Sequence, residues 1–581
     1  MSGFDQYAEI WVVDSEYYAP AGERQVPACI VARELRTGSV VRRVYGEFAS
    51  APPFGVDGRA LYVSFYASAE MGTHLALGWP LPRNIVDLFA EFRVATNGRE
   101  TPAGSGLLGA LAYHGLDSIS AAQKDPGREI AMRGPPWGEE QRAQLLAYCT
   151  SDVDATARLF DRMAPAIDLP RALFRGRYMA AAARMEWNGT PIDTATLATL
   201  REQWEHIQTD LIAEIDKDYG CFEGTTFKRA LFEQFLARNG IAWPRLKSGQ
   251  LDLEDDTFKE IARSNPIIAP LREIRSSLSQ MRLARLSVGS DARNRAMLSA
   301  FGASSGRNTP SNTKFIFGPS VWMRGLIKPE PNTALAYIDW SAQEFGIAAA
   351  LSGDERMMAA YRSGDPYLEF ARQAGAVPVD ATKQSHKSTR DMFKTVVLGV
   401  GYGMEAETLA GRLGISTIES RALLQKHRET YPQFCRWSQN SVDTAMSGTP
   451  LNTVFGWRYT VGPHLRRAEA NPRTVRNFPM QANGAEMLRI ACCLATERGV
   501  RVCAPVHDAI LIEAPADQIE AEVVRMGGYM AAASRIVLAG FELRTDAEII
   551  RYPDRYSDAR GQVMWDRVMK LLRARAPVAY G

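Results

Sequence analysis

The sequence has little cysteine and no long apolar run, and both shortages restrict where the protein can work. Its 581 residues include seven cysteines with no C-x₂-C pair, so neither a disulfide framework nor a zinc site is predicted. No apolar stretch approaches roughly 18 residues, the length that a membrane-spanning helix needs. The opening MSGFDQYAEI lacks the basic and apolar segments of a signal peptide. We therefore expect a cytoplasmic protein without a membrane partner.

A strong net charge is also absent. The 68 basic and 66 acidic side chains leave a formal charge of +2, so a surface for nucleic acid would be a local patch. The hydrophobic content of 46% and the charged content of 23% are typical of a globular protein. We see no internal repeat or low-complexity tract. Because the length exceeds what one core supports, about three or four compact units are expected.

Apolar patterning predicts an α/β front, a helical middle and an α+β back. Residues 8–14 (AEIWVVD) are typical of a buried strand that ends in an acid, and residues 29–32 of its partner. Residues 139–163 have the spacing of an amphipathic helix. A long helical section is predicted over residues 171–300. Three turn-forming pairs break it: Asn188-Gly189, Asn239-Gly240 and Ser248-Gly249.

The back half is predicted to contain a central strand, a block of helices and a hairpin. A loop rich in Gly, Ser, Asn and Pro (residues 302–320) precedes the apolar run 334–339, the predicted strand. Mostly helical segments follow over residues 354–447. The apolar run 502–512 has a His-Asp pair in its middle, which favours a hairpin.

Acidic residues stand at the ends or turns of these apolar segments: Asp339, Asp508 and the pair Asp14 and Glu16. An aspartate that ends an apolar strand is unfavourable unless a metal, a cation or solvent compensates its charge. Taken singly, each acid is more often a turn or cap residue. Taken together, Asp339 and Asp508 would hold two Mg²⁺ ions about 4 Å apart for in-line phosphoryl transfer.

The segment 390–403 predicts a helix with one chemically distinct face. Arg390, Lys394, Leu398 and Tyr402 are spaced by four residues, so they drift only about 40° per step around a helix. Two cations followed by an apolar and an aromatic side chain suit a nucleoside triphosphate. The alternative for such spacing alone is an amphipathic helix with a solvated basic stripe.

Six ordered motifs resemble those of the family A DNA polymerases, similar to the large fragment of bacterial DNA polymerase I and to phage versions. Asp339-Trp-Ser-Ala-Gln-Glu344 resembles the first palm motif, D-Y-S-Q-I-E, and residues 390–403 resemble the fingers motif, R-x₃-K-x₃-F-G-x₂-Y-G. Val506-His507-Asp508 resembles V-H-D-E, and Asn477-Phe-Pro-Met-Gln481 resembles N-x-P-x-Q, with Arg473 upstream. Two earlier segments complete the set: Ser305-Gly306-Arg307-Asn308 (T-G-R) and residues 185–193 (M-E-x-x-G-x-x-I-D).

The resemblance implies a role for each matched residue. Asp339 and Asp508 bind two Mg²⁺ ions, one lowering the pKa of the primer 3′-OH and the other neutralising charge on the triphosphate. Arg390 and Lys394 hold the phosphates, and Lys394 protonates the leaving pyrophosphate. Tyr402 stacks near the templating position and, with Glu344, crowds the 2′ position of the incoming dNTP. The primer terminus and its minor groove are lined by Arg307, Arg473, Asn477, Gln481 and His507. For Asn477 and Gln481 the alternative is a capping or buried polar role.

Two positions depart from the family pattern. Leu398 stands where bacterial members usually have Phe, which keeps an apolar sugar contact but loses the ring. Ala509 replaces the Glu that usually follows the second metal-binding Asp. The resemblance therefore leaves both core ligands, Asp339 and Asp508, in place. Leu398 is also familiar in phage members.

The first 165 residues resemble a DEDD-type 3′–5′ exonuclease. Asp14 and Glu16 match its first motif, and Tyr148 and Asp152 (YCTSD) match its third, with Tyr148 orienting the attacking water. The second motif is irregular, and we place Glu70 at its acid position, with Asp87 as a secondary acid or an alternative. Asp14, Glu16, Glu70 and Asp152 would hold two Mg²⁺ or Mn²⁺ ions. The other interpretation is a degenerate nuclease kept as a scaffold.

The implied fold is an α/β RNase H-like exonuclease domain followed by a right-hand polymerase with an α+β palm and helical fingers and thumb. The predicted ranges are 1–165 (exonuclease), 166–300 (thumb), 301–375 (palm), 376–480 (fingers) and 481–581 (palm). We expect no 5′ nuclease domain. The expected protein is a monomeric phage or prophage replication enzyme in the bacterial or infected host cytosol, with primer–template DNA and dNTPs as partners.

Two other functions could use the same residues. A single-subunit RNA polymerase has the same arrangement of palm and fingers. Glu344 opposes this interpretation because a side chain that blocks the 2′-OH would hinder an RNA polymerase, and the nuclease-like front region opposes it too. A stand-alone nuclease or a non-catalytic DNA-binding protein is the other alternative. The intact set Asp339, Asp508, Arg390 and Lys394 opposes that second alternative.

Overall fold

The computed structural model describes residues 3–116, 121–246, 248–280, 283–318, 320–461 and 472–575. Its contacts divide the chain into two compact units. The first unit comprises Met1–Gly189, Arg295–Pro310 and Thr333–Ile549, and the second comprises Thr190–Asn294, Ser311–Asn332 and Ile550–Gly581. Within the described residues, no helix has the length and apolarity needed to cross a membrane.

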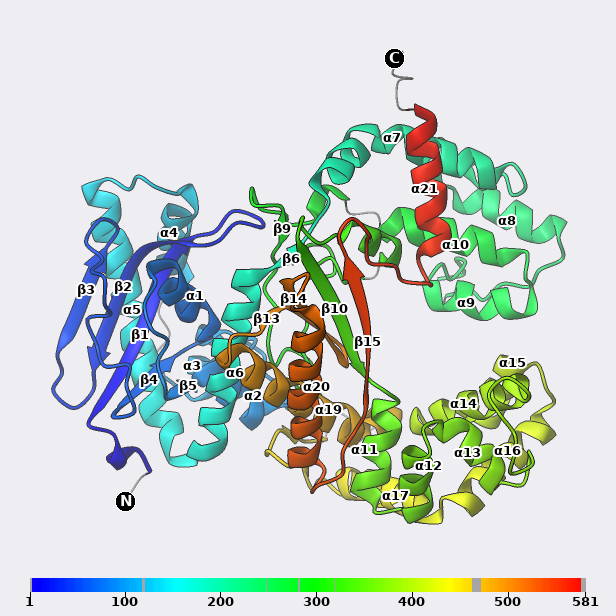
Figure 1. The fold of residues 1–581 in the computed structure, drawn as a ribbon. Helices are drawn as coiled ribbons and strands as arrows, with labels where there is room; N and C mark the ends of the chain where they lie inside the picture. The colour runs from blue at the N-terminus through cyan, green and yellow to red at the C-terminus, as the bar shows by residue number, and fades with distance from the viewer. Residues whose placement is uncertain are drawn as a thin grey trace. The chain divides into compact units, whose positions relative to one another are not determined.

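The front region, residues 3–165, is built on a five-stranded sheet of order β3-β2-β1-β4-β5. β1 pairs antiparallel with β2 and parallel with β4. The helix α5 (Glu139–Met163) packs against β1 and β2, and α1 (Ser68–Leu77) also contacts β1 (Figure 1). The strands are β1 (Glu9–Tyr18), β2 (Val26–Glu34), β3 (Val40–Val44), β4 (Ala60–Ser64) and β5 (Ile85–Asp87).

The structure confirms the first strand, its partner and the helix over residues 139–163. The prediction that the first strand ends at Asp14 is wrong, because β1 continues to Tyr18. Tyr17 and Tyr18 extend the ladder by pairing with Pro27 and Val26, after an irregularity of register between Glu16 and Tyr17. Asp14 and Glu16 therefore lie inside a strand, two residues apart on one face.

A second sheet of order β13-β14-β10-β15 forms the back of the first unit. Its bounds are β10 (Thr333–Trp340), β13 (Arg501–Val506), β14 (Ala509–Pro515) and β15 (Thr545–Arg551). The predicted central strand and the predicted hairpin are confirmed as β10 and β13–β14. The helix α20 (Ile519–Val537) packs on β10 and β14 and against α19 (Pro472–Glu497) (Figure 1).

Helices α11 to α17 confirm the predicted helical block over residues 354–447. In α14, Phe393, Val396 and Val397 are buried, and the Phe393 ring meets that of Phe370 on α13 at 4.8 Å. The buried stripe of α14 thus leaves its opposite face for polar side chains. The helices are α11 (Gln343–Ser352), α12 (Glu355–Arg362), α13 (Pro366–Gln373), α14 (Lys387–Gly401), α15 (Ala406–Leu413), α16 (Thr417–Thr430) and α17 (Pro432–Met446).

The predicted helical section over residues 171–300 is confirmed only in its first part. It contains α6 (Leu169–Asn188), α7 (Thr194–Asp216), α8 (Arg229–Arg238), α9 (Asp255–Ser264) and α10 (Ile268–Gln280). Beyond Arg285 the prediction is wrong. Ala292, Ser299 and Phe301 adopt positive φ angles, which a right-handed helix excludes. Instead, β9 (Arg293–Asn294) pairs with β6 (Thr190–Pro191).

The two compact units do not follow the five predicted domain ranges. Residues 311–332 and 550–581, which the motifs place in the palm, belong to the second unit together with residues 190–294. The second unit also contains the terminal helix α21 (Gln562–Arg575), which packs on α7. The five ranges stay predictions, and the last of them ends outside the described residues.

Candidate functional site

Asp339 and Asp508 meet at one end of the second sheet. Asp339 is the penultimate residue of β10 and faces Ala509, the residue after Asp508, across the ladder. The backbone N–H of Trp340 donates to the Asp508 carbonyl at 3.3 Å. Burial raises the pKa of the Asp339 carboxyl, and the charges of Asp508 and Asp546 raise it further. A bound cation would offset the repulsion among these carboxylates, so their arrangement suits a metal site.

The turn between β13 and β14 sets the position of Asp508. It contains only His507 and Asp508, and His507 has a φ of 58°. A two-residue hairpin turn requires a residue with left-handed backbone, which costs roughly 1–2 kcal/mol for a residue other than Gly. His507 is exposed beside the half-buried Asp508.

Asp546 is an acidic neighbour that the sequence motifs did not identify. It lies on β15, which borders β10 in the sheet, and it accepts a hydrogen bond from the Ser341 hydroxyl. Asp546 belongs to none of the matched motifs. Only the pairing of two strands about 200 residues apart brings it near Asp339, and a local pattern carries no signal for such a pairing.

The polar face of α14 carries two cations that share one aromatic ring. The Arg390 guanidinium lies 5.4 Å from the centroid of Tyr367, and the Lys394 ammonium lies 5.7 Å from it. Two hydrogen bonds fix the orientation of the Arg390 guanidinium. Its Nε donates to Asp365 Oδ2 at 2.6 Å, and its Nη1 donates to Asp391 Oδ1 at 3.0 Å. Lys394 is exposed and Leu398 half-buried.

Glu344, Tyr402 and Arg307 come from three distant segments and meet around one carboxylate oxygen. The Tyr402 hydroxyl donates to Glu344 Oε1 at 3.3 Å, and Arg307 Nη2 lies 3.7 Å from the same atom. Burial and the Glu344 charge raise the pKa of Tyr402 to about 12, so its hydroxyl stays protonated and can donate. The buried Nε of Arg307 has no hydrogen-bond partner among the described residues.

Arg473, Asn477 and Gln481 are spaced by four residues along α19, which places them on one helical face. With Tyr402 they border a pocket of about 390 Å³. Arg473 Nη2 also donates to Glu405 at 3.4 Å. The motif at 473–481 therefore identifies a set of side chains that the structure gathers beside Tyr402.

The front region carries a separate group of acids. Asp14 and Glu16 on β1 and Asp152 on α5 have carboxylate oxygens that all lie within 4.8 Å of one another. Tyr148 lies one turn before Asp152. Burial raises the pKa of Tyr148, and the charges of Asp152, Glu16 and Asp14 raise it further. The hydroxyl therefore remains a proton donor beside the three carboxylates.

Glu70 lies near this group without joining the three oxygens. It is 2% exposed on α1, and its Oε2 has no hydrogen-bond partner among the described residues. Burial raises the pKa of Glu70, and the charge of Asp14 raises it further. Asp87, the alternative acid, caps α2 (Leu88–Thr96): its Oδ1 accepts from Ala90 N–H at 2.8 Å and its Oδ2 from Ala67 N–H at 2.5 Å.

Both acidic groups offer oxygen atoms for a divalent metal. Hard cations such as Mg²⁺ and Mn²⁺ prefer carboxylate oxygens. The buried oxygen of Glu70 that lacks a partner among the described residues fits a metal in the front region, since an unpaired buried carboxylate is otherwise costly. The donor sets therefore fit divalent ions at both places.

Comparisons with known proteins converge on one family. The family model described as "DNA polymerase family A" matches residues 226–549. DNA polymerase I of Chloroflexus aurantiacus is 26% identical over 410 residues, covering 65% of this chain and 43% of that protein. The DNA polymerase of Mycobacterium phage L5 is 22% identical over 419 residues, covering 70% of this chain and 67% of that one. The chain spans less than half the length of the first curated relatives that it matches.

A solved structure shares the fold over nearly the whole chain. It is described as the "POL domain of Pol1 from M. smegmatis complex with DNA primer-template and dNTP". The TM-score is 0.71 at 18% identity, covering 93% of this chain and 94% of that one. This likeness is consistent with the predicted right-hand polymerase fold.

Proposed function

Because the chain belongs to the family A DNA polymerases, we propose that it extends the 3′-OH of a DNA primer with dNTPs along a template. The observation that carries the proposal is the meeting of Asp339 and Asp508 at the end of the second sheet. The Tyr402–Glu344–Arg307 contact, made by segments far apart in the chain, supports it.

Asp339 and Asp508 would hold two Mg²⁺ ions, and bound Mg²⁺ supplies the acidity of the 3′-OH and the charge neutralisation of phosphoryl transfer. Lys394 is the exposed cation that would contact the phosphates and return a proton to pyrophosphate. Arg390 would add hydrogen-bond donors, with its orientation fixed by Asp365. Leu398, on the same helix face, would lie against the sugar.

Tyr402 and Glu344 would select the sugar. Their hydrogen bond would hold the tyrosine ring against the 2′ carbon of a bound dNTP. A 2′-OH at that carbon would have to break the bond. Breaking a hydrogen bond to a charged group costs about 1.5–3 kcal/mol. That cost corresponds to roughly a tenfold to hundredfold preference for dNTPs over rNTPs.

Arg307, Arg473, Asn477, Gln481 and His507 would contact the primer terminus through the minor groove. Acceptors in that groove are nearly alike for every correct base pair, so donors there test pair geometry without reading sequence. The pocket beside Tyr402, bordered by Arg473, Asn477 and Gln481, supports this assignment.

Primer extension with Mg²⁺ tests the polymerase. We expect Asp508→Asn to abolish extension while binding primer–template DNA as the parent does. The matched control is Asp517→Asn, an exposed aspartate just beyond the far end of β14, which should extend normally. Extension by Asp508→Asn at the parent rate would overturn the metal-binding role.

We propose 3′–5′ exonuclease activity as the second function, carried by an RNase H-like front region. Its support is the group Asp14, Glu16 and Asp152, with Tyr148 beside it and Glu70 as the fourth acid.

Degradation of a labelled primer without dNTPs tests the nuclease. Asp14→Asn and Glu70→Gln should each prevent degradation and leave extension intact. The control is Asp161→Asn, an exposed residue of α5, which should degrade the primer as the parent does. Degradation by Asp14→Asn at the control rate would overturn the assignment, and a parent that degrades nothing would identify a scaffold.

The biological setting is also a proposal. Leu398 and the similarity to the polymerase of Mycobacterium phage L5 support a phage or prophage replication enzyme. We place it as a monomer in the cytoplasm.

A further inference from the structure

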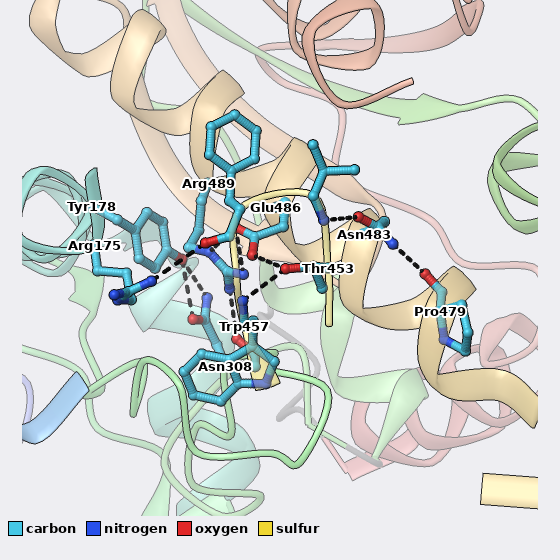
Figure 2. Close-up of polar contacts among 12 residues, drawn as sticks. Arg175, Tyr178, Asn308, Thr453, Trp457, Pro479, Asn483, Glu486 and Arg489 are labelled. Carbon is cyan, nitrogen blue, oxygen red and sulfur yellow. Dashed lines mark hydrogen bonds and ion pairs between the residues drawn. The ribbon is translucent and has the colours of Figure 1, made fainter. Parts of the chain in front are cut away.

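A buried ion pair on α19 has no part in the proposed chemistry. Arg489 and Glu486 are each 2% exposed. Arg489 Nε donates to Glu486 Oε2 at 3.2 Å, and Nη2 lies 2.9 Å from the same oxygen (Figure 2). Burying such a pair costs desolvation that its own attraction barely repays. Its presence therefore points to a further use of the guanidinium.

The third nitrogen of Arg489 reaches the backbone beside Arg307. Nη1 donates to the Gly306 carbonyl at 2.7 Å. That carbonyl belongs to the planar peptide unit that joins Gly306 to Arg307. The hydrogen bond therefore fixes the orientation of the peptide plane that carries the Arg307 backbone nitrogen. The rings of Phe301 and Tyr178 lie 4.9 and 5.9 Å from the guanidinium, which adds cation–π attraction.

The other half of the pair is held by the hairpin of β11 (Leu451–Asn452) and β12 (Arg458–Tyr459). Thr453 Oγ1 donates to Glu486 Oε1 at 2.8 Å and accepts from Trp457 N–H at 2.8 Å. Trp457 Nε1 then donates to the Ser304 carbonyl at 2.8 Å. Residues 301–308, called here the Arg307 loop, are thus anchored at two backbone carbonyls. Arg489 holds the Gly306 carbonyl directly, and Glu486 holds the Ser304 carbonyl through Thr453 and Trp457.

Two further contacts complete the support of the Arg307 loop. Gly306 has a φ of +74°, and a Cβ there would lie 3.0 Å from the Trp457 ring. The Asn308 amide donates to the Tyr178 hydroxyl at 2.7 Å. The loop is therefore held on both sides of Arg307, at Gly306 and at Asn308. The Arg307 side chain nevertheless keeps a donor without a partner among the described residues.

We propose that Arg489 is a positioning residue for Arg307. By fixing the Gly306–Arg307 peptide it holds the Arg307 guanidinium at the Glu344 carboxylate, ready for the primer terminus. The inference rests on the proposed polymerase function. It deepens that function by assigning a role to a buried residue that no substrate atom touches.

A double-mutant cycle tests the assignment. The variant Glu486→Gln/Arg489→Met removes the guanidinium without leaving a buried charge unpaired, and the new amide oxygen can still accept from Thr453. Single-nucleotide insertion should fall on the order of tenfold to hundredfold, in kcat more than in the KM for dNTP. In an Arg307→Ala background the same change should have no further effect. Equal losses in both backgrounds, or no loss in either, would overturn the proposal.

Primer–template affinity, measured by fluorescence anisotropy over the same four proteins, separates this inference from the proposed function. If the parent binds DNA but extends nothing, the proposed function fails, while non-additive affinities would still support positioning and additive ones would reject it. Arg489→Lys keeps the charge but not the fork geometry, and we expect it to recover part of the insertion rate.

The matched control is a second ion pair of low exposure, the buried Arg324 with the partly buried Asp558 in the second unit. Arg324 Nη1 donates to Asp558 Oδ2 at 2.7 Å and its Nη2 to the Phe317 carbonyl at 3.1 Å. Asp558→Asn/Arg324→Met therefore makes the same kind of chemical change in a pair that does not bond the Arg307 loop. It should lower the Tm comparably and leave insertion unchanged.

Discussion

At the scale of single residues, we expect Glu186 to make folding stability depend on pH. Burial raises the pKa of its carboxyl to about 7, while Oε1 accepts from Leu298 N–H at 2.7 Å. Because the unfolded chain releases this proton at lower pH, folding stability should fall as pH rises from about 4.5 to about 7. Glu186→Gln should remove up to about 3 kcal/mol of that dependence, measured by urea unfolding from pH 4.5 to 8.

The direction of the effect is the decisive part of this measurement. The parent and Glu186→Gln should differ most above pH 7, with the variant more stable. Glu139→Gln, an exposed acid at the start of α5, is the control and should follow the parent. A variant that loses stability at pH 8 would show that the carboxylate is ionised and satisfied.

At this scale, the acidic and basic residues that stand in short motifs are predictable from the sequence. The buried residues that hold those motifs in position are not. Asp339, Asp508, Lys394 and Tyr402 stand in patterns that local spacing reveals. Arg489 stands in a stretch of α19 that is buried on nearly every side, so no amphipathic pattern marks its polar role. The partner of a buried charge is chosen by tertiary packing, which a local pattern does not encode.

At the scale of elements, strands and helices with a clear hydrophobic period are predictable from the sequence. Pairings between very short strands that are far apart in the chain are not. The hairpin β13–β14 and helix α5 follow apolar runs whose length and period decide the type. The β6–β9 pair has two residues in each strand and joins distant segments, since Thr190 pairs with Asn294. Nothing in a short window distinguishes it from a helix end, so the helical prediction over 286–300 is wrong.

The Arg307 loop gives a prediction at this scale. Gly306→Ala forces a side chain into a positive φ and against the Trp457 ring at 3.0 Å. Backbone strain alone costs roughly 1–2 kcal/mol, and the ring contact should add to it. We expect a loss of about 2–4 kcal/mol in urea unfolding, together with slower primer extension.

Gly240→Ala separates the two causes. Gly240 has a φ of +64°, and no atom lies within 4 Å of the position that a Cβ would take there. Its substitution should therefore cost the strain alone and leave extension intact. Equal losses at Gly240 and Gly306 would mean that the Trp457 ring moves aside freely.

At the scale of the whole molecule, one side chain of the front region bonds two segments that lie more than 200 residues further along the chain. Asn97, at the end of α2, donates to the Ser304 carbonyl at 2.6 Å and to the Arg458 carbonyl at 2.7 Å. Thr460 N–H donates back to the Asn97 carbonyl at 3.1 Å. The Arg307 loop and the β11–β12 hairpin are thus both tied to residue 97. No motif indicates this link, because an Asn before a Gly predicts only a turn.

Asn97→Ala tests the link. It removes the hydrogen bond to the Arg458 carbonyl and one of the two to the Ser304 carbonyl, which keeps its bond from Trp457 Nε1. The two lost bonds should cost about 1–3 kcal/mol in total, and we expect primer extension to slow several-fold while exonuclease activity persists. Asn84→Ala is the matched control, because Asn84 also donates to two carbonyls, Gly58 at 3.2 Å and Ala60 at 3.1 Å, within the front region. It should destabilise the fold without slowing extension. Equal effects of the two variants on extension would refute a specific link.

The bonds of Asn97 also bear on how this kind of chain can change over generations. If the proposed nuclease function holds, a lineage that no longer needs proofreading could lose Asp14 by a single neutral step, because the proposed extension reaction would not use it. The same lineage could not discard the surrounding domain, because Asn97 bonds the Arg307 loop, which belongs to the proposed polymerase site. Descendants of such a lineage should therefore keep Asn97 after the acids of the proposed nuclease site have been substituted. The front region would then be retained only for its structural support of the Arg307 loop.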